Sequence, residues 1–182
     1  MAELGTTLLQ LARDAITAQF GQTATAPVDL PELHKMGASF VTLTQHEELR
    51  GCMGSLEAWR PLQLDVEENA RNAAFRDPRF KPLTEEELPV TRLEVSLLTG
   101  VEPMTFNSEA DALGQLRPEI DGVIFIAGRH RSTFLPQVWA QLPSPTDFMA
   151  HLKQKAGVSA KYWGADVQLE RYTVQKWRET KP

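Results

Sequence analysis

The sequence predicts an α+β fold with a mainly antiparallel sheet flanked by helices. Segments typical of strands and helices follow one another without the regular strand–helix–strand alternation that produces a parallel sheet. Two strand-like segments, 38–45 and 49–54, are separated by a few polar residues, which favours an antiparallel hairpin. A chain of 182 residues is long enough for a larger and a smaller lobe around a cleft.

Two longer helices are predicted in the first half of the chain. Apolar residues recur at helical spacing over residues 4–20, and Gly21 is expected to end that helix. A second helix is expected over 61–76, because Pro61 suits the first turn and Pro78 disfavours helix at the residue before it.

Shorter elements are predicted in the second half. They are a helix over 84–88 with Thr84 and Glu87 as a capping box, a strand over 93–97, a helix over 108–116, a strand over 123–126, a helix over 136–141, a helix over 146–155 capped by Thr146, and a strand over 166–175. Gly100 and Pro103 are expected to end the strand over 93–97, and residues 129–131 are expected to form a basic turn.

The composition excludes several classes of protein. No run approaches the ~20 apolar residues that span a bilayer, and a net charge of −5 argues against a general nucleic-acid surface. The single cysteine excludes an internal disulfide and a self-contained iron–sulfur cluster, and it is compatible with a cytoplasmic location. The sequence has no HExxH, CxxC, Walker A or Rossmann glycine motif, so neither a metal nor a cofactor is predicted.

The segment 49–54, Leu-Arg-Gly-Cys-Met-Gly, is the strongest candidate for a functional site. In a strand, side chains alternate between the two faces, so Leu49 and Met53 are predicted to be buried together. Arg50 and Cys52 are then expected to line a concave surface on the other face.

Gly51 and Gly54 lie on either side of the cysteine. Glycine inside a strand is typical of positions where a ligand or another part of the backbone comes close. Both glycines are therefore candidate binding residues.

Cys52 has two interpretations. A neighbouring arginine lowers the pKa of a thiol, which would make Cys52 reactive, and catalysis would also need a base, usually histidine. Of the four histidines, only His130 lies next to other polar candidates. The alternative, favoured by how often free cysteines are buried, is a small hydrophobic side chain in a strand.

Arginines form a second set of candidates. Arg76, Asp77 and Arg79 follow a predicted helix end, and Arg129 and Arg131 follow a predicted strand end. Arginine suits bidentate recognition of carboxylate or phosphate, whereas surface ion pairs are the alternative. Asp77 is expected to orient an arginine or to cap the turn. Four aromatic residues are candidates either for stacking on a base or for the core: Trp139, Tyr162, Trp163 and Trp177.

The hexapeptide at 49–54 resembles the LRGCIG motif of the AMMECR domain family, with Met53 in place of isoleucine. Further segments resemble blocks of the same family in the same order: 40–43, 72–80, 133–138 and 155–157. The resemblance covers roughly residues 8–175 and implies one AMMECR-type domain over 1–182, with two subdomains as the open alternative.

The resemblance implies a small system whose other components are a Memo-type protein and a radical-SAM enzyme. The strand 49–54 is expected to line a cleft for an anionic small molecule or a nucleotide-like group, with Cys52 as the candidate catalytic residue. The candidate binding residues are Arg50, Gly51, Gly54, Arg76, Asp77, Arg79, Arg129, Arg131 and Thr133. The alternative is a non-catalytic binding or adaptor module for the Memo-type partner.

Overall fold

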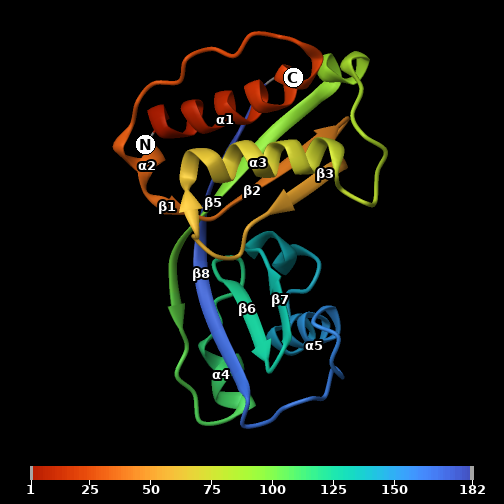
Figure 1. Cartoon of the computed structure of the whole chain (residues 1–182). Helices are drawn as coiled ribbons and strands as arrows, with labels where there is room; N and C mark the ends of the chain where they lie inside the picture. The colour runs from red at the N-terminus through yellow and green to blue at the C-terminus, as the bar shows by residue number, and fades with distance from the viewer. Residues whose placement is uncertain (1, 181–182) are drawn as a thin grey trace. The chain divides into compact units, whose positions relative to one another are not determined.

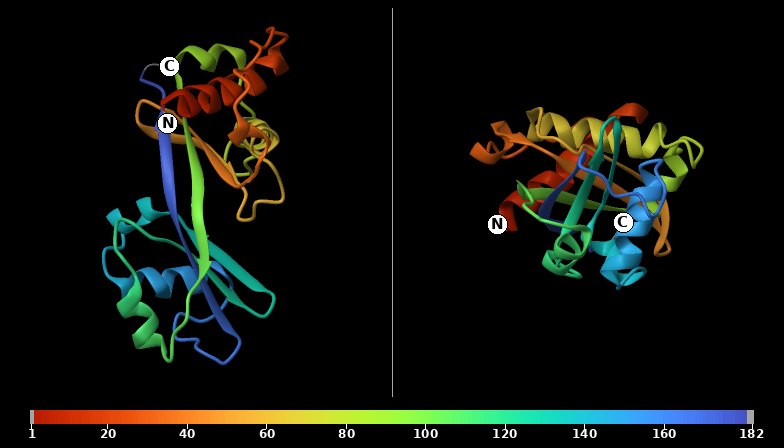
Figure 2. Two further views of the ribbon diagram at one scale, coloured as in Figure 1. Left: turned by 90° about the vertical axis from the view of Figure 1, so that its left-hand side faces the viewer. Right: turned by 90° about the horizontal axis from the view of Figure 1, so that it is seen from below.

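A computed structural model describes residues 2–180 of the chain (Figure 1). The chain forms two compact units, of which the first comprises residues up to Leu97 and from Gln175 onward, and the second comprises Leu98–Val174. The six-stranded sheet has the order β3-β2-β5-β8-β6-β7. Its long strands β5 (Thr91–Pro103) and β8 (Val167–Arg178) are neighbours and lie side by side in Figures 1 and 2. The predicted α+β class is confirmed.

The first unit contains the two longer helices. Its elements are α1 (Ala2–Thr17), α2 (Pro31–His34), β1 (Met36–Gly37), β2 (Ser39–Gln45), β3 (Glu48–Gly54), β4 (Arg60–Pro61), α3 (Leu62–Phe75), the 3-10 helices Ala18–Phe20 and Glu85–Val90, the beginning of β5 and the end of β8. Gly21 follows α1 and a 3-10 turn at a φ of +79°, a left-handed conformation that glycine adopts at little cost. The predicted helix end is therefore confirmed.

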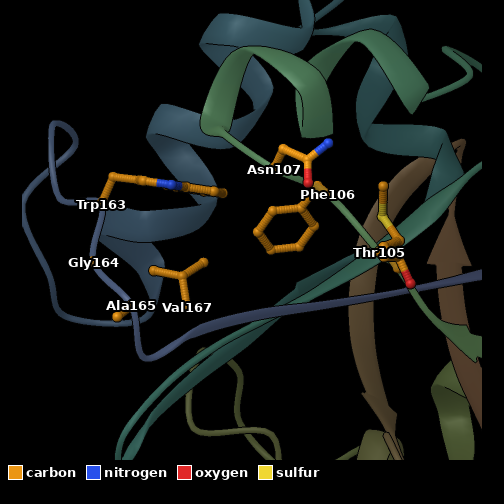
Figure 3. Close-up of a pocket in the computed structure, with 8 residues that line it drawn as sticks. Thr105, Phe106, Asn107, Trp163, Gly164, Ala165 and Val167 are labelled. Carbon is orange, nitrogen blue, oxygen red and sulfur yellow. The ribbon is translucent and has the colours of Figure 1, made fainter.

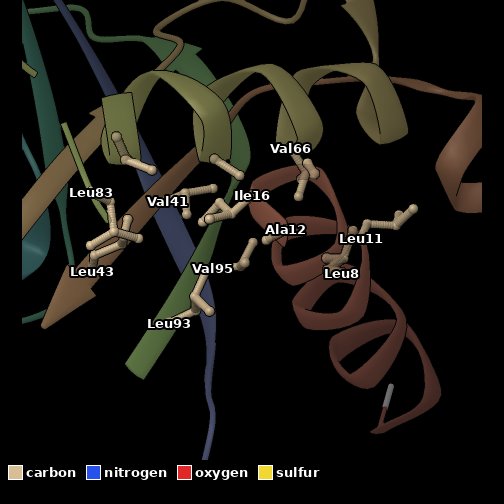
Figure 4. Packing of buried hydrophobic residues seen from close by; sticks show 14 of the residues in the cluster. Leu8, Leu11, Ala12, Ile16, Val41, Leu43, Val66, Leu83, Leu93 and Val95 are labelled. Atoms are coloured by element: carbon tan, nitrogen blue, oxygen red, sulfur yellow. The ribbon is translucent and has the colours of Figure 1, made fainter. Parts of the chain in front are cut away.

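The core of the first unit lies between these helices and one face of the sheet. Figure 4 shows Leu8 and Ile16 of α1 and Val66 of α3 facing Val41 of β2 and Val95 of β5. All five side chains are buried. Each buried aliphatic side chain of this size stabilises the fold by about 1.5–3 kcal/mol relative to an exposed one.

The second unit has its own core. It contains α4 (Glu109–Gln115), β6 (Gly122–Ala127), β7 (His130–Phe134), a 3-10 helix (Pro136–Ala140) and α5 (Pro145–Lys155). The rings of Trp139 and Phe148 stack with their centroids 3.8 Å apart. The indole N–H of Trp139 donates to the Asp121 carbonyl at 2.7 Å, which satisfies the polar atom of this buried side chain.

Three predictions about the helices, strands and turns are wrong. Strand β5 continues through Gly100 to Pro103, because the positive φ of Gly100 (+63°) is accommodated within the strand. Residues 130–134 form β7, which pairs with β6 across a tight turn, so only Arg129 of the predicted basic turn lies in a turn. The cap residue of α5 is Ser144, not Thr146.

Within residues 2–180, no helix combines the length and the apolar character that crossing a membrane requires.

Candidate functional site

The candidate strand β3 lies at the edge of the sheet and contains an irregularity. Its pairing with β2 places Gly51 opposite Leu43 but Leu49 opposite Thr44, so Arg50 is the extra residue of a β-bulge. A one-residue shift moves the preceding side chain to the other face. Leu49 is consequently 44% exposed, and the prediction that it is buried is wrong.

Arg50 is paired within the protein. Its Nε and Nη2 donate to the two carboxylate oxygens of Glu87 at 2.8 and 3.0 Å, and Nη2 also donates to the Lys81 carbonyl at 3.0 Å. The guanidinium lies over the Phe80 ring, and only 13% of the Arg50 side chain is exposed. Arg50 therefore holds the segment 80–87 against β3, and its charge is already compensated by Glu87.

Glu87 joins three segments of the first unit. Besides Arg50, its carboxylate accepts the backbone N–H of Thr84 at 2.9 Å and the Gln45 amide at 3.2 Å. The predicted capping box at the start of the 3-10 helix Glu85–Val90 is thus present. The hydrogen bond from Arg50 is the main cause that lowers the pKa of Glu87 to about 2.

The two glycines of the candidate strand serve packing. A Cβ on Gly51 would lie 2.2 Å from the carbonyl oxygen of Ala73 in α3, and a Cβ on Gly54 would lie 2.3 Å from the Phe40 ring. The sequence predicted that a ligand or another part of the backbone comes close to these glycines. In the structure, the α3 backbone comes close to Gly51, and the Phe40 ring comes close to Gly54. Met53 is partly buried against the core, as predicted.

Cys52 lies on the opposite face from α3. Its Sγ is 3.3 Å from the Thr42 hydroxyl, and burial raises the pKa of the thiol although this hydrogen bond and the Arg79 charge lower it. The hypothesis that Arg50 lowers the Cys52 pKa is wrong, because burial raises that pKa and Arg50, which is paired with Glu87, is not among the charged groups that act on the thiol. The thiol is protonated at neutral pH.

Asp77 and Arg79 cover the outer edge of β3 at Cys52. The backbone N–H of Cys52 donates to Asp77 Oδ2 at 2.9 Å, and its carbonyl accepts a 3.4 Å hydrogen bond from Arg79 Nη2. Arg79 in turn binds both oxygens of the buried Asp77 carboxylate, which holds the pKa of that carboxyl well below its usual range. Backbone groups of an edge strand that are covered in this way are withdrawn from pairing with another chain.

These contacts agree with two sequence predictions. Asp77 orients an arginine, and Arg79 lies beside the candidate strand. Arg79 keeps 54% of its side chain exposed, and Arg76, which pairs with Glu68 at 3.3 Å, keeps 71%.

The remaining candidate residues belong to the second unit. Arg129 is exposed in the β6–β7 turn, and Arg131 is half-buried in β7. Thr133 is buried, where its hydroxyl donates to the Val123 carbonyl at 2.8 Å and lies 2.8 Å from the Tyr172 hydroxyl. The structure thus divides the predicted binding residues between the two units.

The Cys52 thiol lies among charged groups of the first unit. The charged groups that act on its thiol are Arg79, Asp77 and Glu94, and within residues 2–180 no histidine forms a hydrogen bond with it. His130 instead bonds the Ala156 carbonyl in the second unit. In the same part of the chain, no group of three His, Cys, Asp or Glu residues is arranged to hold a metal ion.

The sequence did not predict a cavity that the second unit contains. It has a volume of about 570 Å³ and is shown in Figure 3. The lining residues are Met104, Thr105, Phe106, Asn107, Trp163, Gly164, Ala165 and Val167. Of the four aromatic candidates, Trp163 lines this cavity, whereas Trp139 is a core residue. Nothing in the sequence indicated this cavity beyond the presence of Trp163, because the two segments that line it, 104–107 and 163–167, lie far apart in the chain.

Comparison with known proteins places the chain beside one family. The AMMECR1 family model matches residues 9–177. A protein of Methanothermobacter thermautotrophicus is 34% identical over 180 residues, covering 96% of this chain and 94% of the relative. Protein MJ0810 of Methanocaldococcus jannaschii is 34% identical over 185 residues, covering 99% and 92%. The crystal structure of the uncharacterized protein PH0010 from Pyrococcus horikoshii is similar with a TM-score of 0.88 at 31% identity, covering 98% of this chain and 92% of that one.

Proposed function

Because the chain belongs to the AMMECR1 family, we propose that it acts as a non-catalytic binding module within a system that includes a Memo-type protein and a radical-SAM enzyme. The observation that carries this proposal is the internal pairing of the candidate strand. Arg50 is bound by Glu87. The pKa of the Cys52 thiol is raised, and within residues 2–180 no histidine forms a hydrogen bond with this thiol. A thiol in this state is a poor nucleophile.

The surface proposed for the partner lies beside the edge of β3. Arg76, Arg79 and Lys81 are exposed there within six residues of one another, on a chain whose net charge is −5. Arg76 and Arg79 are paired with Glu68 and Asp77, but both guanidinium groups stay exposed beside Lys81, and exposed cations of this kind favour an acidic surface and increase the rate of encounter with it. The proposed contact on the Memo-type protein is therefore a cluster of carboxylates.

A second candidate function is the binding of an anionic small molecule by the same arginines. The half-exposed guanidinium of Arg79 favours it, because arginine recognises carboxylate and phosphate in a bidentate manner. In this case the anion contacts Arg79 and not Arg50.

The test measures the affinity of the full chain for the Memo-type protein of the same organism. Charge reversal by Arg76→Glu or Lys81→Glu is expected to weaken binding by at least about tenfold, which corresponds to about 1.4 kcal/mol. Lys161→Glu, at an exposed lysine of the second unit, is the matched control and is expected to bind normally.

Cys52→Ser is expected to retain binding and to support growth in a complementation assay. Loss of function by Cys52→Ser with unchanged partner affinity and melting temperature would instead support a thiol enzyme. Equal affinity of all charge-reversal variants would contradict the proposed surface. Binding of inorganic phosphate that is lost in Arg79→Gln, without any partner binding, would support the second candidate.

A further inference from the structure

The cavity of the second unit has the size and lining of a small-molecule site. Its volume of about 570 Å³ lies within the range of about 300–1,000 Å³ that is typical of ligand pockets. Met104, Phe106, Trp163 and Val167 provide apolar and aromatic surface, and Figure 3 shows the two rings with Val167 beneath them. None of the eight lining side chains is charged.

The aromatic wall of the cavity is held in a fixed position. The rings of Phe106 and Trp163 pack against each other with centroids 5.4 Å apart and planes inclined by 54°. The ammonium group of Lys153 lies over the Trp163 ring, 5.3 Å from its centroid. Lys153 is itself buried and paired with Glu109, so the indole is supported from outside the lining. A wall that is ordered before a ligand arrives reduces the entropic cost of binding.

Two polar groups in the lining remain available to a ligand. Within residues 2–180, neither the indole N–H of Trp163 nor the side-chain amide of Asn107 has a hydrogen-bond partner. Asn107 uses only its backbone N–H, which donates to Asp111 at 2.9 Å. Figure 3 shows the Asn107 amide directly above the Phe106 ring. An asparagine amide both donates and accepts, and an indole donates, so the complementary ligand carries both kinds of group.

The charges around the cavity select against an anion. The ammonium group that lies over the aromatic wall, that of Lys153, is already paired with Glu109. Two carboxylates belong to residues within or near the lining segments: that of Asp111 accepts the backbone N–H of Asn107, and that of Asp166 accepts the Tyr162 hydroxyl. A phosphate or carboxylate group would therefore meet negative charge without a free cation in the lining.

We propose that this cavity binds an uncharged planar heteroaromatic ring, of the class represented by the purine base of a nucleoside. The ring packs against the wall formed by Phe106 and Trp163, and its polar edge bonds the Asn107 amide. This site shares no residue with the surface proposed for the protein partner, and neither proposal depends on the other.

Titration of the isotope-labelled full chain by NMR tests the proposal, with the Trp163 indole N–H and the Asn107 side-chain amide as reporters. The probes are adenosine, indole and AMP. Adenosine or indole is expected to shift the Trp163 signal with a Kd of about 1 mM or lower, and AMP is expected to bind at least about tenfold more weakly than adenosine. Asn107→Leu is expected to weaken adenosine binding by about tenfold and to leave indole binding unchanged, since indole does not use the amide.

Trp163→Ala is expected to abolish binding of both rings, and Trp59→Ala, at an exposed tryptophan of the first unit, is the matched control. Asn107 is exposed, so its variant tests the site even where Trp163→Ala fails to fold. Absence of any shift at Trp163 with adenosine and indole overturns the proposal. Shifts confined to other residues, or AMP binding as tight as that of adenosine, overturn it as well.

Discussion

The backbone N–H of Cys52 donates to the Asp77 carboxylate at 2.9 Å, so a side chain takes the position that a carbonyl of a neighbouring strand would occupy. Arg79 completes the arrangement by donating to the Cys52 carbonyl and to Asp77. The edge of β3 is therefore closed at this residue by an ion pair of the same chain.

Asp77→Asn is expected to lower the free energy of unfolding by about 1–3 kcal/mol, because the substitution removes charge-assisted hydrogen bonds to a buried acceptor. Urea denaturation of the full chain measures this difference. Asp29→Asn is the control, since Asp29 is exposed and pairs only with exposed His34; it is expected to change stability by less than about 0.5 kcal/mol. Equal losses in the two variants would contradict the structural role of Asp77.

Gly51→Ala is expected to destabilise the protein by about 3 kcal/mol, the upper end of overpacking costs, because the new Cβ meets the α3 backbone at Ala73, which cannot rotate away. Gly114→Ala is the matched control within α4, where a Cβ meets nothing within 4 Å. That variant is expected to gain up to about 1 kcal/mol from higher helix propensity. Thermal unfolding of both variants gives the comparison, and a stable Gly51→Ala would show that α3 does not approach β3 this closely.

The stability of the protein is expected to fall as the pH decreases from about 4.5 to 2. The folded pKa of Glu87 is lowered from 4.5 to about 2, so its contribution is fully present above the unfolded pKa and is lost as pH falls through the folded pKa. Glu87→Gln removes the titration of this carboxyl, so the free energy of unfolding is expected to depend less on pH. The pH dependence that remains comes in part from Asp77, whose pKa is also lowered. Urea unfolding at about pH 5, 4 and 3 measures the free energy of unfolding of the unmodified protein and of Glu87→Gln. An equal loss of stability with decreasing pH in both proteins would contradict the prediction.

Cys52 is expected to react with iodoacetamide more slowly in the folded protein than in the urea-unfolded chain at the same neutral pH. Burial raises the thiol pKa and thereby lowers the thiolate fraction, and only the thiolate is alkylated. Arg50→Ala is expected not to slow the reaction further, because Glu87 already compensates that charge. Faster alkylation of the folded protein would show that the thiol is activated and would reopen the enzyme hypothesis.

Most of the fold was predictable because it depends on local patterns. Periodicity indicated α1 and α3, and the polar residues between β2 and β3 indicated their hairpin. The exceptions have physical causes. Gly100 usually ends a strand but is tolerated within β5 at a positive φ. The bulge at Arg50, which turns Leu49 outward, depends on the register with β2 and has no signal in the six residues themselves.

The candidate site was less predictable than the fold because its energetics depend on distant partners. The sequence placed Arg50 next to Cys52, yet the partner of Arg50 is Glu87, 37 residues away. Arg50 is paired with that carboxylate and does not lower the pKa of the Cys52 thiol, although the two residues are close in the sequence. Likewise Phe106 and Trp163 meet in the cavity although no local pattern connects them.

The pairing of Arg50 with Glu87 also constrains how this sequence can diverge. Loss of the arginine alone would leave a carboxylate without its main counter-charge, and loss of the carboxylate alone would leave a guanidinium that is largely withdrawn from water. We therefore expect selection to act on the two positions together. Among relatives that lose one of these residues, replacement of the other is the expected compensating change, although the two positions are 37 residues apart along the chain.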